Sequence, residues 1–311
     1  MRLLFLFLDG VGLGIDDPKI NPFARADIPI LHKLLGGKRL VANAAPYFGS
    51  RASLVSLDAC MGVDGMPQSA TGQASLLTGQ NVPASIGYHY GPKPNHLVAT
   101  YLLNGNIFNI LRKNGKSAAL LNAYPGRYFE GISSGKRMYS AIPLAVTSAG
   151  IALKTEVDLY QGNAIAADFT AQGWRDVLHM PNTPVITSFQ AGERLATIAR
   201  DYDLAFFEYW LSDYAGHHQD MTQALALLES FDTMLAGLLN RWDDNEGLVL
   251  ITSDHGNLED LSTRRHTRNP VPALVIGKPE HRAQFSEGLT SLSDIAPAIT
   301  RFIFPQGENR A

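Results

Sequence analysis

Aspartate and histidine residues in this chain are gathered in four separated clusters. The clusters lie in the segments FLFLDGVG, DYAGHH, ITSDHGN and RRHTRNPVP, and a serine-rich segment, PQSATGQASLLTG, lies between the first and the second. The six candidate metal ligands are Asp9, Asp213, His217, Asp254, His255 and His266. With one hydroxyl nucleophile added, this is the inventory that a two-metal site for phosphoryl transfer needs.

The spacing within the clusters indicates how the ligands could converge. Asp213 and His217 are four residues apart and would share one face of a helix, although Gly216 between them also permits a loop. Asp254 and His255 are adjacent and can converge only on a turn, which the following GN dipeptide favours. All the candidate ligands are nitrogen or oxygen donors, so we expect two divalent cations, Zn²⁺ or Mn²⁺.

The serine-rich segment supplies the candidate nucleophiles Ser69, Thr71 and Ser75. Gly72 would let another backbone come close, and Ala74–Leu77 is expected to form a helix packed on the sheet. A nucleophile at the beginning of that helix would gain from the helix dipole, which favours a bound phosphate. From the local sequence alone, Ser69 or Thr71 could equally well be a helix N-cap.

The composition excludes several classes of protein. The chain has 311 residues, of which 45% are hydrophobic, so it can bury one large α/β core. Its net charge of −3 argues against binding nucleic acid by general electrostatics. The single cysteine, Cys60, excludes an internal disulfide framework and a thiolate zinc cluster.

The beginning of the chain, MRLLFLFLDG, predicts a buried first strand rather than a signal peptide, because the apolar run is short and ends in Asp9. No stretch approaches the roughly 20 apolar residues that a membrane span needs. We therefore expect a soluble, cytoplasmic protein that acts on a small molecule and binds neither membrane nor nucleic acid.

Short apolar runs alternate with helical patterns along most of the chain. The predicted strands are Leu3–Leu8, Ser117–Asn122, Leu204–Tyr209, Leu248–Thr252 and Ala273–Ile276. The predicted helices are Ile28–Leu35, Ile107–Lys113, Ala191–Asp201, Gln219–Trp242 and Ser293–Phe302. The continuous apolar strands predict an α/β fold with a mostly parallel sheet sandwiched by helices. Ligands would then collect at the carboxyl ends of the strands, where three of the clusters lie.

Residues 124–188 interrupt this alternation. The segment is rich in Gly, Ser, Thr and Pro and has no clear period, so we expect a small cap-like insertion. Residues 1–123 and 189–311 would form the core domain.

The motifs resemble those of the alkaline phosphatase superfamily, in particular its branch with cofactor-independent phosphoglycerate mutase and phosphopentomutase. The matching segments are DGVGLG at Asp9, DYAGH at Asp213, DHGNLE at Asp254 and HTRNPVP at His266, in family order and over nearly the whole chain. The resemblance implies an alkaline-phosphatase-like fold. In the superfamily the nucleophile lies ten residues before the glycine that closes an LLTG-like segment, here Gly79, which selects Ser69 with Thr71 second.

The resemblance also implies how two metal ions would be held. One metal would be held by Asp9, Ser69, Asp254 and His255. The other would be held by Asp213, His217 and His266. Ser69 would attack phosphorus to form a phosphoserine, and catalysis would consist mainly of positioning and charge neutralisation.

The chain departs from the mutases in the size of its insertion, which is too short for their inserted transferase domain with its many substrate-binding arginines. Its basic residues could bind a substrate phosphate or carboxylate. They are Arg127, Lys136, Arg137, Lys154 and Arg175. The leading hypothesis is a two-metal phosphohydrolase of a small phosphate ester, because retention of the phosphoryl group needs a cap that excludes water. The alternatives are a phosphomutase and a non-catalytic metal-binding protein of the same fold.

A few further polar residues flank the ligand clusters. Glu208 and Asp220 are expected to orient the histidines of the second cluster. Glu259 is expected to do the same for His255, with Arg265 paired to it. In the polar segment GYHYGPKPNH, at residues 87–96, Tyr88, His89 and His96 could line the pocket, but the segment is interpreted as a polar loop.

Overall fold

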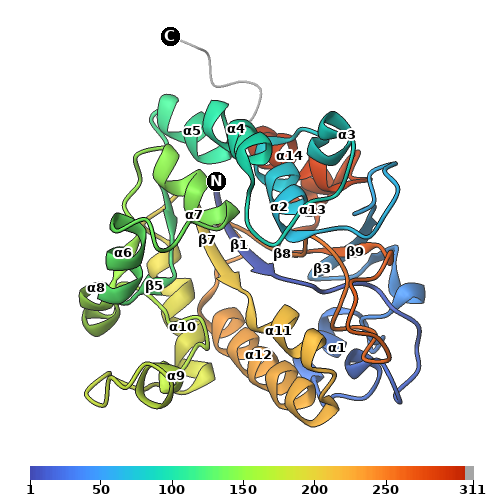
Figure 1. Cartoon of the computed structure of the whole chain (residues 1–311). Helices are drawn as coiled ribbons and strands as arrows, with labels where there is room; N and C mark the ends of the chain where they lie inside the picture. Colours follow the sequence, from blue (N-terminus) through green and yellow to red (C-terminus); the bar gives the residue numbers. More distant parts are fainter. Residues whose placement is uncertain (305–311) are drawn as a thin grey trace.

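The computed structural model describes residues 1–304, which are arranged around one central sheet (Figure 1). Seven strands lie in the order β2-β3-β9-β8-β1-β7-β4. Their bounds are β1 Arg2–Leu8, β2 Tyr47–Phe48, β3 Ala52–Leu57, β4 Ala118–Leu120, β7 Leu204–Tyr209, β8 Gly247–Thr252 and β9 Val271–Ile276. Two short strands, β5 Ala123–Tyr124 and β6 Lys154–Thr155, pair with each other outside it.

The centre of the sheet is parallel, as the continuous apolar runs predict. β1 pairs in parallel with β8 and β7, and β4 pairs in parallel with β7. β9 runs antiparallel to both β8 and β3, and β2 runs antiparallel to β3, so five of the seven strands point the same way. The predicted fold class is therefore confirmed, with the antiparallel edge as an addition. Strand β3 was not predicted from the sequence, because polar and apolar residues are mixed in it.

Helices cover both faces of this sheet. Their bounds are α1 Pro29–Leu34, α2 Ser69–Thr78, α3 Val82–Ile86, α4 His96–Asn104, α5 Ile107–Lys113, α6 Gly126–Ser133, α7 Ala141–Ser148, α8 Glu156–Gln161, α9 Gln172–Asp176, α10 Ser188–Ala199, α11 Leu211–His218, α12 Met221–Arg241, α13 Pro279–Ser286 and α14 Ile295–Ile303. In Figure 1, α1, α10, α11 and α12 lie below the sheet, and α2, α4, α5, α7, α13 and α14 lie above it.

Side chains of β1 alternate between two hydrophobic clusters, one on each face. Leu4, Leu6 and Leu8 pack against α10 and α12, whereas Phe5 and Phe7 pack in the cluster that contains α2 and α14. A strand that is buried on both faces in this way is fixed in register, because a slip of one residue would exchange the two clusters. The strand end that precedes Asp9 is therefore held in place by both layers.

The segment 124–188 folds partly into the main core. Its helix α7 packs with Ala141, Ile142, Ala145 and Val146 in the same hydrophobic cluster as α2 and α4. Ile165 and Phe169 of the segment pack in the main cluster on the other face of the sheet. A separate small cluster forms around Trp174, and α6, α8 and α9 lie at one side of the molecule (Figure 1). The division of the chain at residues 124 and 188 stays a prediction.

None of the helices in residues 1–304 combines the length and the apolar character that crossing a membrane requires.

Candidate active site

Three strand ends bring the first three clusters to one edge of the sheet. β1, β7 and β8 are parallel neighbours, with Leu8 paired to Tyr209 and Phe7 paired to Thr252. Asp9 follows β1 directly, and its backbone N–H donates to Tyr209 O over 3.1 Å. Asp254 comes two residues after β8, and Asp213 lies in α11, which begins just after β7. The predicted convergence at the carboxyl ends of the strands therefore occurs.

Asp213, His217 and His266 form one compact group, whose ligand atoms all lie within 4.8 Å of one another. His217 Nε2 is 3.3 Å from Asp213 Oδ2, and His266 Nε2 is 3.7 Å from Asp213 Oδ1. The δ1 nitrogens of the two rings donate to backbone carbonyls, His217 to Arg264 O and His266 to Pro67 O, each over 2.8 Å. Because a carbonyl only accepts, each ring keeps its ε2 lone pair for a metal ion.

Asp9 and His255 form the second group, which Asp213 joins within the same 4.8 Å limit. His255 Nε2 lies 3.4 Å from Asp9 Oδ1, 3.7 Å from Asp254 Oδ2 and 3.0 Å from Ser69 Oγ. The His255 and His266 rings stack with their centroids 3.8 Å apart, so the two groups are contiguous. All six ligands and the hydroxyl proposed from the sequence thus lie in one site.

Ser69 is the first residue of α2, and the N-cap is Gln68, whose side chain makes no capping hydrogen bond. The interpretation of Ser69 or Thr71 as an N-cap is therefore wrong. The Thr71 hydroxyl is fully buried, accepts a hydrogen bond from Tyr90 N over 3.1 Å and donates to Gln68 O over 3.2 Å. Of the two candidate nucleophiles, Ser69 is the one beside the ligands.

The carboxylates of the site are poorly compensated by the protein alone. Burial, followed by the charges of Asp254 and Asp213, raises the pKa of Asp9 well above its usual range. Burial likewise raises the pKa of Asp254 to about 7. The buried Asp9 Oδ1 accepts no hydrogen bond from any described residue. Converging carboxylates with an orphaned oxygen fit divalent cations, which would offset the repulsion.

The surroundings of the histidines set their protonation states: His255 and His266 are neutral, and His217 is paired with Asp213. Burial lowers the pKa of His255, and burial together with His255 lowers the pKa of His266 to about 4. A hydrogen bond to Asp213 raises the pKa of His217. Burial alone would raise the pKa of Asp213, but hydrogen bonds from His217 and Asn257 hold it below its usual range. Neutral imidazoles at His255 and His266 are in the state that ligates metal ions.

Two amide side chains that were not singled out from the sequence support the carboxylates. Gln73 Nε2 donates to Asp254 Oδ2 over 3.0 Å and to Asp9 Oδ2 over 3.4 Å. Asn257 Nδ2 donates to Asp213 Oδ1 over 2.6 Å. Gln73 lies one helical turn after Ser69, and that spacing was the only signal that could have found it.

Two glycines allow the elements of the site to approach closely. A Cβ on Gly72 would lie 2.8 Å from Asp254 O, so the expectation of a close backbone approach at this residue is confirmed. A Cβ on Gly216 would lie 2.6 Å from Asn257 Cγ. Gly216 does not produce a loop, because Asp213 and His217 both lie within helix α11; it makes room for Asn257 instead.

The flanking acidic residues have structural partners of their own. Asp220 caps α12 by accepting hydrogen bonds from the backbone N–H groups of Thr222 and Gln223. Glu208 is buried in β7, where burial, followed by Asp254, raises its pKa to about 7. Within residues 1–304, neither carboxylate forms a hydrogen bond or an ion pair with a ligand histidine.

Glu259 holds the loop segments around the site together. It accepts hydrogen bonds from Gly12 N over 2.9 Å, from Asn257 N over 2.8 Å and from the hydroxyl of Thr267. It also accepts from Asn269 Nδ2 over 3.0 Å. The expected pairing of Arg265 with Glu259 is not found among the described residues.

A cavity of about 340 Å³ opens onto the ligands. It is lined by Met66, Gln68, Ser69, Pro92, Asp213, His217, Arg265 and His266. Arg265 is the basic side chain in this lining, and its guanidinium makes no hydrogen bond or ion pair within residues 1–304. The neighbouring arginines are engaged, since Arg264 Nε donates to Gln219 and Arg268 Nη1 donates to Gly65 O.

The basic residues of segment 124–188 do not line this cavity. Arg137 lies over the ring of Tyr128 at 4.9 Å, and Arg175 Nε donates to Thr183 O over 2.7 Å. Lys154 lies over the ring of Tyr202 at 5.7 Å. Arg127 and Lys136 are likewise absent from the lining. The structure therefore does not bring the predicted substrate-binding residues to the site.

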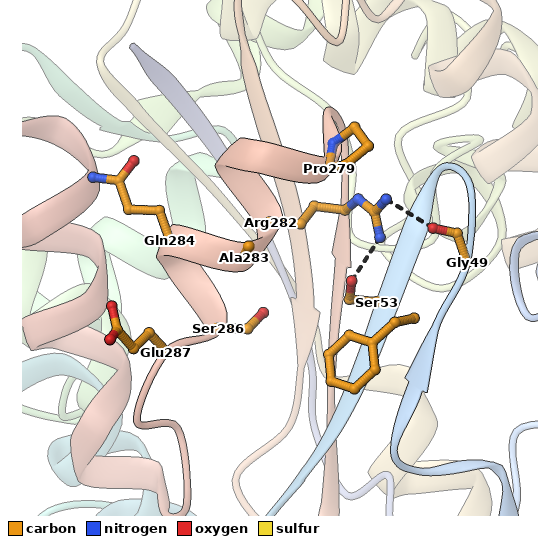
Figure 2. Close-up of a pocket in the computed structure, with 9 residues that line it drawn as sticks. Gly49, Ser53, Pro279, Arg282, Ala283, Gln284, Ser286 and Glu287 are labelled. Atoms are coloured by element: carbon orange, nitrogen blue, oxygen red, sulfur yellow. Dashed lines mark hydrogen bonds between the residues drawn. The ribbon is translucent and has the colours of Figure 1, made fainter.

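A larger cavity, of about 660 Å³, lies elsewhere, between α13 and the β2–β3 hairpin (Figure 2). Arg282 lies in its wall and donates to Ser53 Oγ over 2.6 Å and to Gly49 O over 2.8 Å. Its Nε donates to Gly277 O, so the guanidinium holds three backbone segments together. This cavity contains none of the candidate ligands.

Comparisons with known proteins show the family of the chain. A sequence model of the Metalloenzyme superfamily matches residues 1–304. The 2,3-bisphosphoglycerate-independent phosphoglycerate mutase of Methylobacillus flagellatus is 32% identical over 125 residues, which cover 37% of this chain and 24% of that protein. The mutase of Haloquadratum walsbyi is 35% identical over 113 residues, covering 33% of this chain and 22% of that protein. The matched segments thus span about a quarter of these relatives.

Solved structures share the fold at low sequence identity. The PH0037 protein from Pyrococcus horikoshii superposes with a TM-score of 0.56 at 17% identity, covering 97% of this chain and 96% of that one. The alkaline phosphatase from the Antarctic bacterium TAB5 superposes with a TM-score of 0.50 at 13% identity, covering 97% of both chains. These likenesses show the fold.

Proposed function

This chain belongs to the Metalloenzyme superfamily, and from that premise we propose that it is a metal-dependent phosphoryl-transfer enzyme that hydrolyses a small phosphate ester. One observation carries the proposal. Three imidazole ε2 nitrogens and the Asp9 and Asp213 carboxylates form two contiguous groups, and Ser69 Oγ lies 3.0 Å from the nearest of these nitrogens. A nucleophile next to two cation sites is the arrangement that phosphoryl transfer through a covalent intermediate needs.

The proposed metal ions are Zn²⁺ or Mn²⁺, one held by Asp9, Ser69, Asp254 and His255 and the other by Asp213, His217 and His266. When bound, they would neutralise the phosphate oxygens and favour the deprotonated serine hydroxyl. Gln73 holds Asp9 and Asp254 in place, and Asn257 holds Asp213. Arg265 stands in the cavity wall with its guanidinium free to bind a phosphate oxygen.

In the proposed reaction, Ser69 Oγ forms a bond to phosphorus while the ester P–O bond breaks. The leaving group departs with that electron pair and takes up a proton to become an alcohol. Water then attacks the phosphoserine, which releases inorganic phosphate and restores the serine hydroxyl. The position of Ser69 at the first turn of α2 supports this assignment, because the N-terminus of a helix favours a bound phosphate.

Hydrolysis is favoured over retention of the phosphoryl group by the surroundings of the cavity. A mutase must exclude water while the phosphoserine exists and must rebind the second hydroxyl. Here the basic residues of segment 124–188 lie outside the cavity lining. This segment therefore places no cationic side chain over the cavity in which a phosphoserine would have to be shielded. Water would reach the phosphoserine.

The test is an assay of metal-stripped protein with p-nitrophenyl phosphate and bis(p-nitrophenyl) phosphate, with Mn²⁺, Zn²⁺ and Mg²⁺ added back singly. Metal-dependent release of nitrophenol that is lost in Ser69→Ala would support the hydrolase and identify the class of ester. A protein that binds the metals but releases no nitrophenol would contradict it.

Phosphomutase activity is the second candidate, because the curated relatives named above are phosphoglycerate mutases. It would be recognised by interconversion of 2- and 3-phosphoglycerate, followed by ³¹P NMR, without release of inorganic phosphate. Metal binding with neither activity would leave the third possibility, a non-catalytic protein of the same fold.

A further inference from the structure

The cavity above the metal-ligand groups adjoins a second cavity. This second cavity has a volume of about 470 Å³ and shares Met66 and Gln68 with the first. Its lining consists of Asp64, Gly65, Met66, Gln68, Tyr88, His89, Tyr90 and Gly91, and we call it the Tyr88 cavity. Gln68 directly precedes the candidate nucleophile Ser69. A phosphate ester at Ser69 would therefore have room for its leaving group on the other side of Gln68.

The wall of the Tyr88 cavity is fixed relative to the nucleophile. Thr71 N donates to Tyr90 O over 3.0 Å, and Tyr90 N donates to Thr71 Oγ1 over 3.1 Å. Gly91 lies so close that a Cβ there would be 3.2 Å from Ser69 N. These contacts attach residues 90 and 91 to the first turn of α2, so the distance from the nucleophile to this wall is set by the fold.

The wall presents aromatic rings. The rings of Tyr88 and Tyr90 meet edge to face, with centroids 6.2 Å apart and an interplanar angle of 75°. Tyr88 is 41% exposed, and its hydroxyl accepts a hydrogen bond from Asn95 Nδ2 over 3.2 Å, which orients the ring. Met66, at 40% exposed, completes an apolar rim. An exposed ring that is held in one orientation, such as that of Tyr88, is suited to packing on another ring.

The charged side chains around the two cavities differ. Asp213 and Arg265 line the catalytic cavity, whereas the lining of the Tyr88 cavity contains the carboxylate of Asp64. Arg268 lies beside the Tyr88 cavity, because its Nη1 donates to Gly65 O over 2.8 Å. Burial lowers the pKa of His89, and the charge of Arg268 lowers it further.

We propose that the Tyr88 cavity binds the leaving group of the substrate, and that this group carries a planar aromatic ring. The inference rests on the proposed function, since it takes Ser69 as the site of phosphoryl transfer. It narrows the substrate class to phosphate esters of aromatic alcohols or of alcohols that bear a heteroaromatic ring. Small esters without a ring, such as phosphoglycerate, would leave this cavity unfilled.

The experiment compares two phosphonates whose P–C bond cannot be hydrolysed, benzylphosphonate and propylphosphonate. Their dissociation constants with the Mn²⁺-loaded protein are measured by titration calorimetry. We expect benzylphosphonate to bind about tenfold more tightly, as packing between aromatic rings would give. The ratio of the two dissociation constants should fall close to one in Tyr88→Ala. It should stay about tenfold in Tyr88→Phe, because this variant keeps the ring. Tyr160→Ala is the matched control, because Tyr160 is similarly exposed, at 44%, and lies on α8.

Equal affinities in the wild type, no binding of either phosphonate, or a preference that survives in Tyr88→Ala would overturn the inference. Hydrolysis is measured separately with p-nitrophenyl phosphate. Hydrolysis without a preference among phosphonates would leave the proposed function standing and remove the aromatic subsite. A preference without hydrolysis would contradict the proposed function, and the Tyr88 cavity would then bind an aromatic ring but not a leaving group.

Discussion

Ser69 Oγ and His255 Nε2 lie 3.0 Å apart, although the two residues are separated by 186 positions in the chain. The contact joins the first turn of α2 to the loop after β8. It is possible because Gly72 lets α2 approach the backbone of Asp254. The candidate nucleophile and the candidate ligands are therefore brought together by one close contact between a helix and a strand end.

Replacement of Ser69 by alanine should abolish turnover. The variant lacks the oxygen that attacks phosphorus, so we expect kcat with p-nitrophenyl phosphate to fall by a factor of about 10³ or more. Circular dichroism should be unchanged, since only one hydroxyl is lost. Ser85→Ala, at an exposed serine of α3, is the control and should retain full activity. Activity that survives in Ser69→Ala would contradict a phosphoserine intermediate at this residue.

Replacement of His217 by alanine should remove one metal ion. His217 supplies one of three ligands in its group, and we expect metal affinity to fall by more than about 100-fold, beyond the loss typical of residues that only support a ligand. The measurement is metal content after dialysis, by mass spectrometry. His218→Ala is the matched control, because His218 is the next residue, is exposed and packs on the ring of Tyr214 at 4.0 Å. Equal metal content in the two variants would refute the assignment.

Asp254→Asn should stabilise the metal-free protein in a pH-dependent way. The pKa of Asp254 is raised to about 7 in the folded state, so this state binds more protons than the unfolded chain between pH 4 and pH 7. The contribution of Asp254 to stability is therefore fully present below pH 4 and is lost as pH rises towards 7.

The difference in Tm between Asp254→Asn and the wild type should accordingly grow over this range, in favour of the variant. Adding Mn²⁺ should narrow the difference at pH 8, because a cation at 100 times its Kd stabilises the wild type by about 2.7 kcal/mol. A difference in Tm that does not change with pH would count against the raised pKa.

Arg265→Ala should weaken substrate binding. If the free guanidinium binds a phosphate oxygen, its loss should raise KM for p-nitrophenyl phosphate about 10- to 100-fold, the range for a hydrogen bond between charged groups. Arg265→Lys should recover part of the loss. Arg264→Ala is the neighbouring control, because its guanidinium is engaged by Gln219 and its contact with His217 is through the backbone. An unchanged KM in Arg265→Ala would remove this residue from the site.

The candidate ligand set and the layers of the fold could both be predicted from the sequence. Continuous apolar runs such as those of β1 and β8 need burial on both faces, so an α/β sheet and the edge at which Asp9 and Asp254 would meet could be predicted from the local pattern. The spacing of four residues between Asp213 and His217 likewise predicted that they share one face of a helix. These features depend on the periodicity of apolar residues and on the residue types at the end of each strand, and both are local properties of the chain.

Only the tertiary structure decided which polar residues face the site. Gln73 and Asn257 have ordinary local surroundings, and their importance comes from carboxylates far away in the sequence. The same holds for Arg265, which lines the cavity, and for Arg137, which lies over Tyr128 instead. The direction of a long side chain in a loop is set by packing between segments, and no local pattern encodes it. The antiparallel edge formed by β3 and β9 likewise needed the pairing of two distant segments.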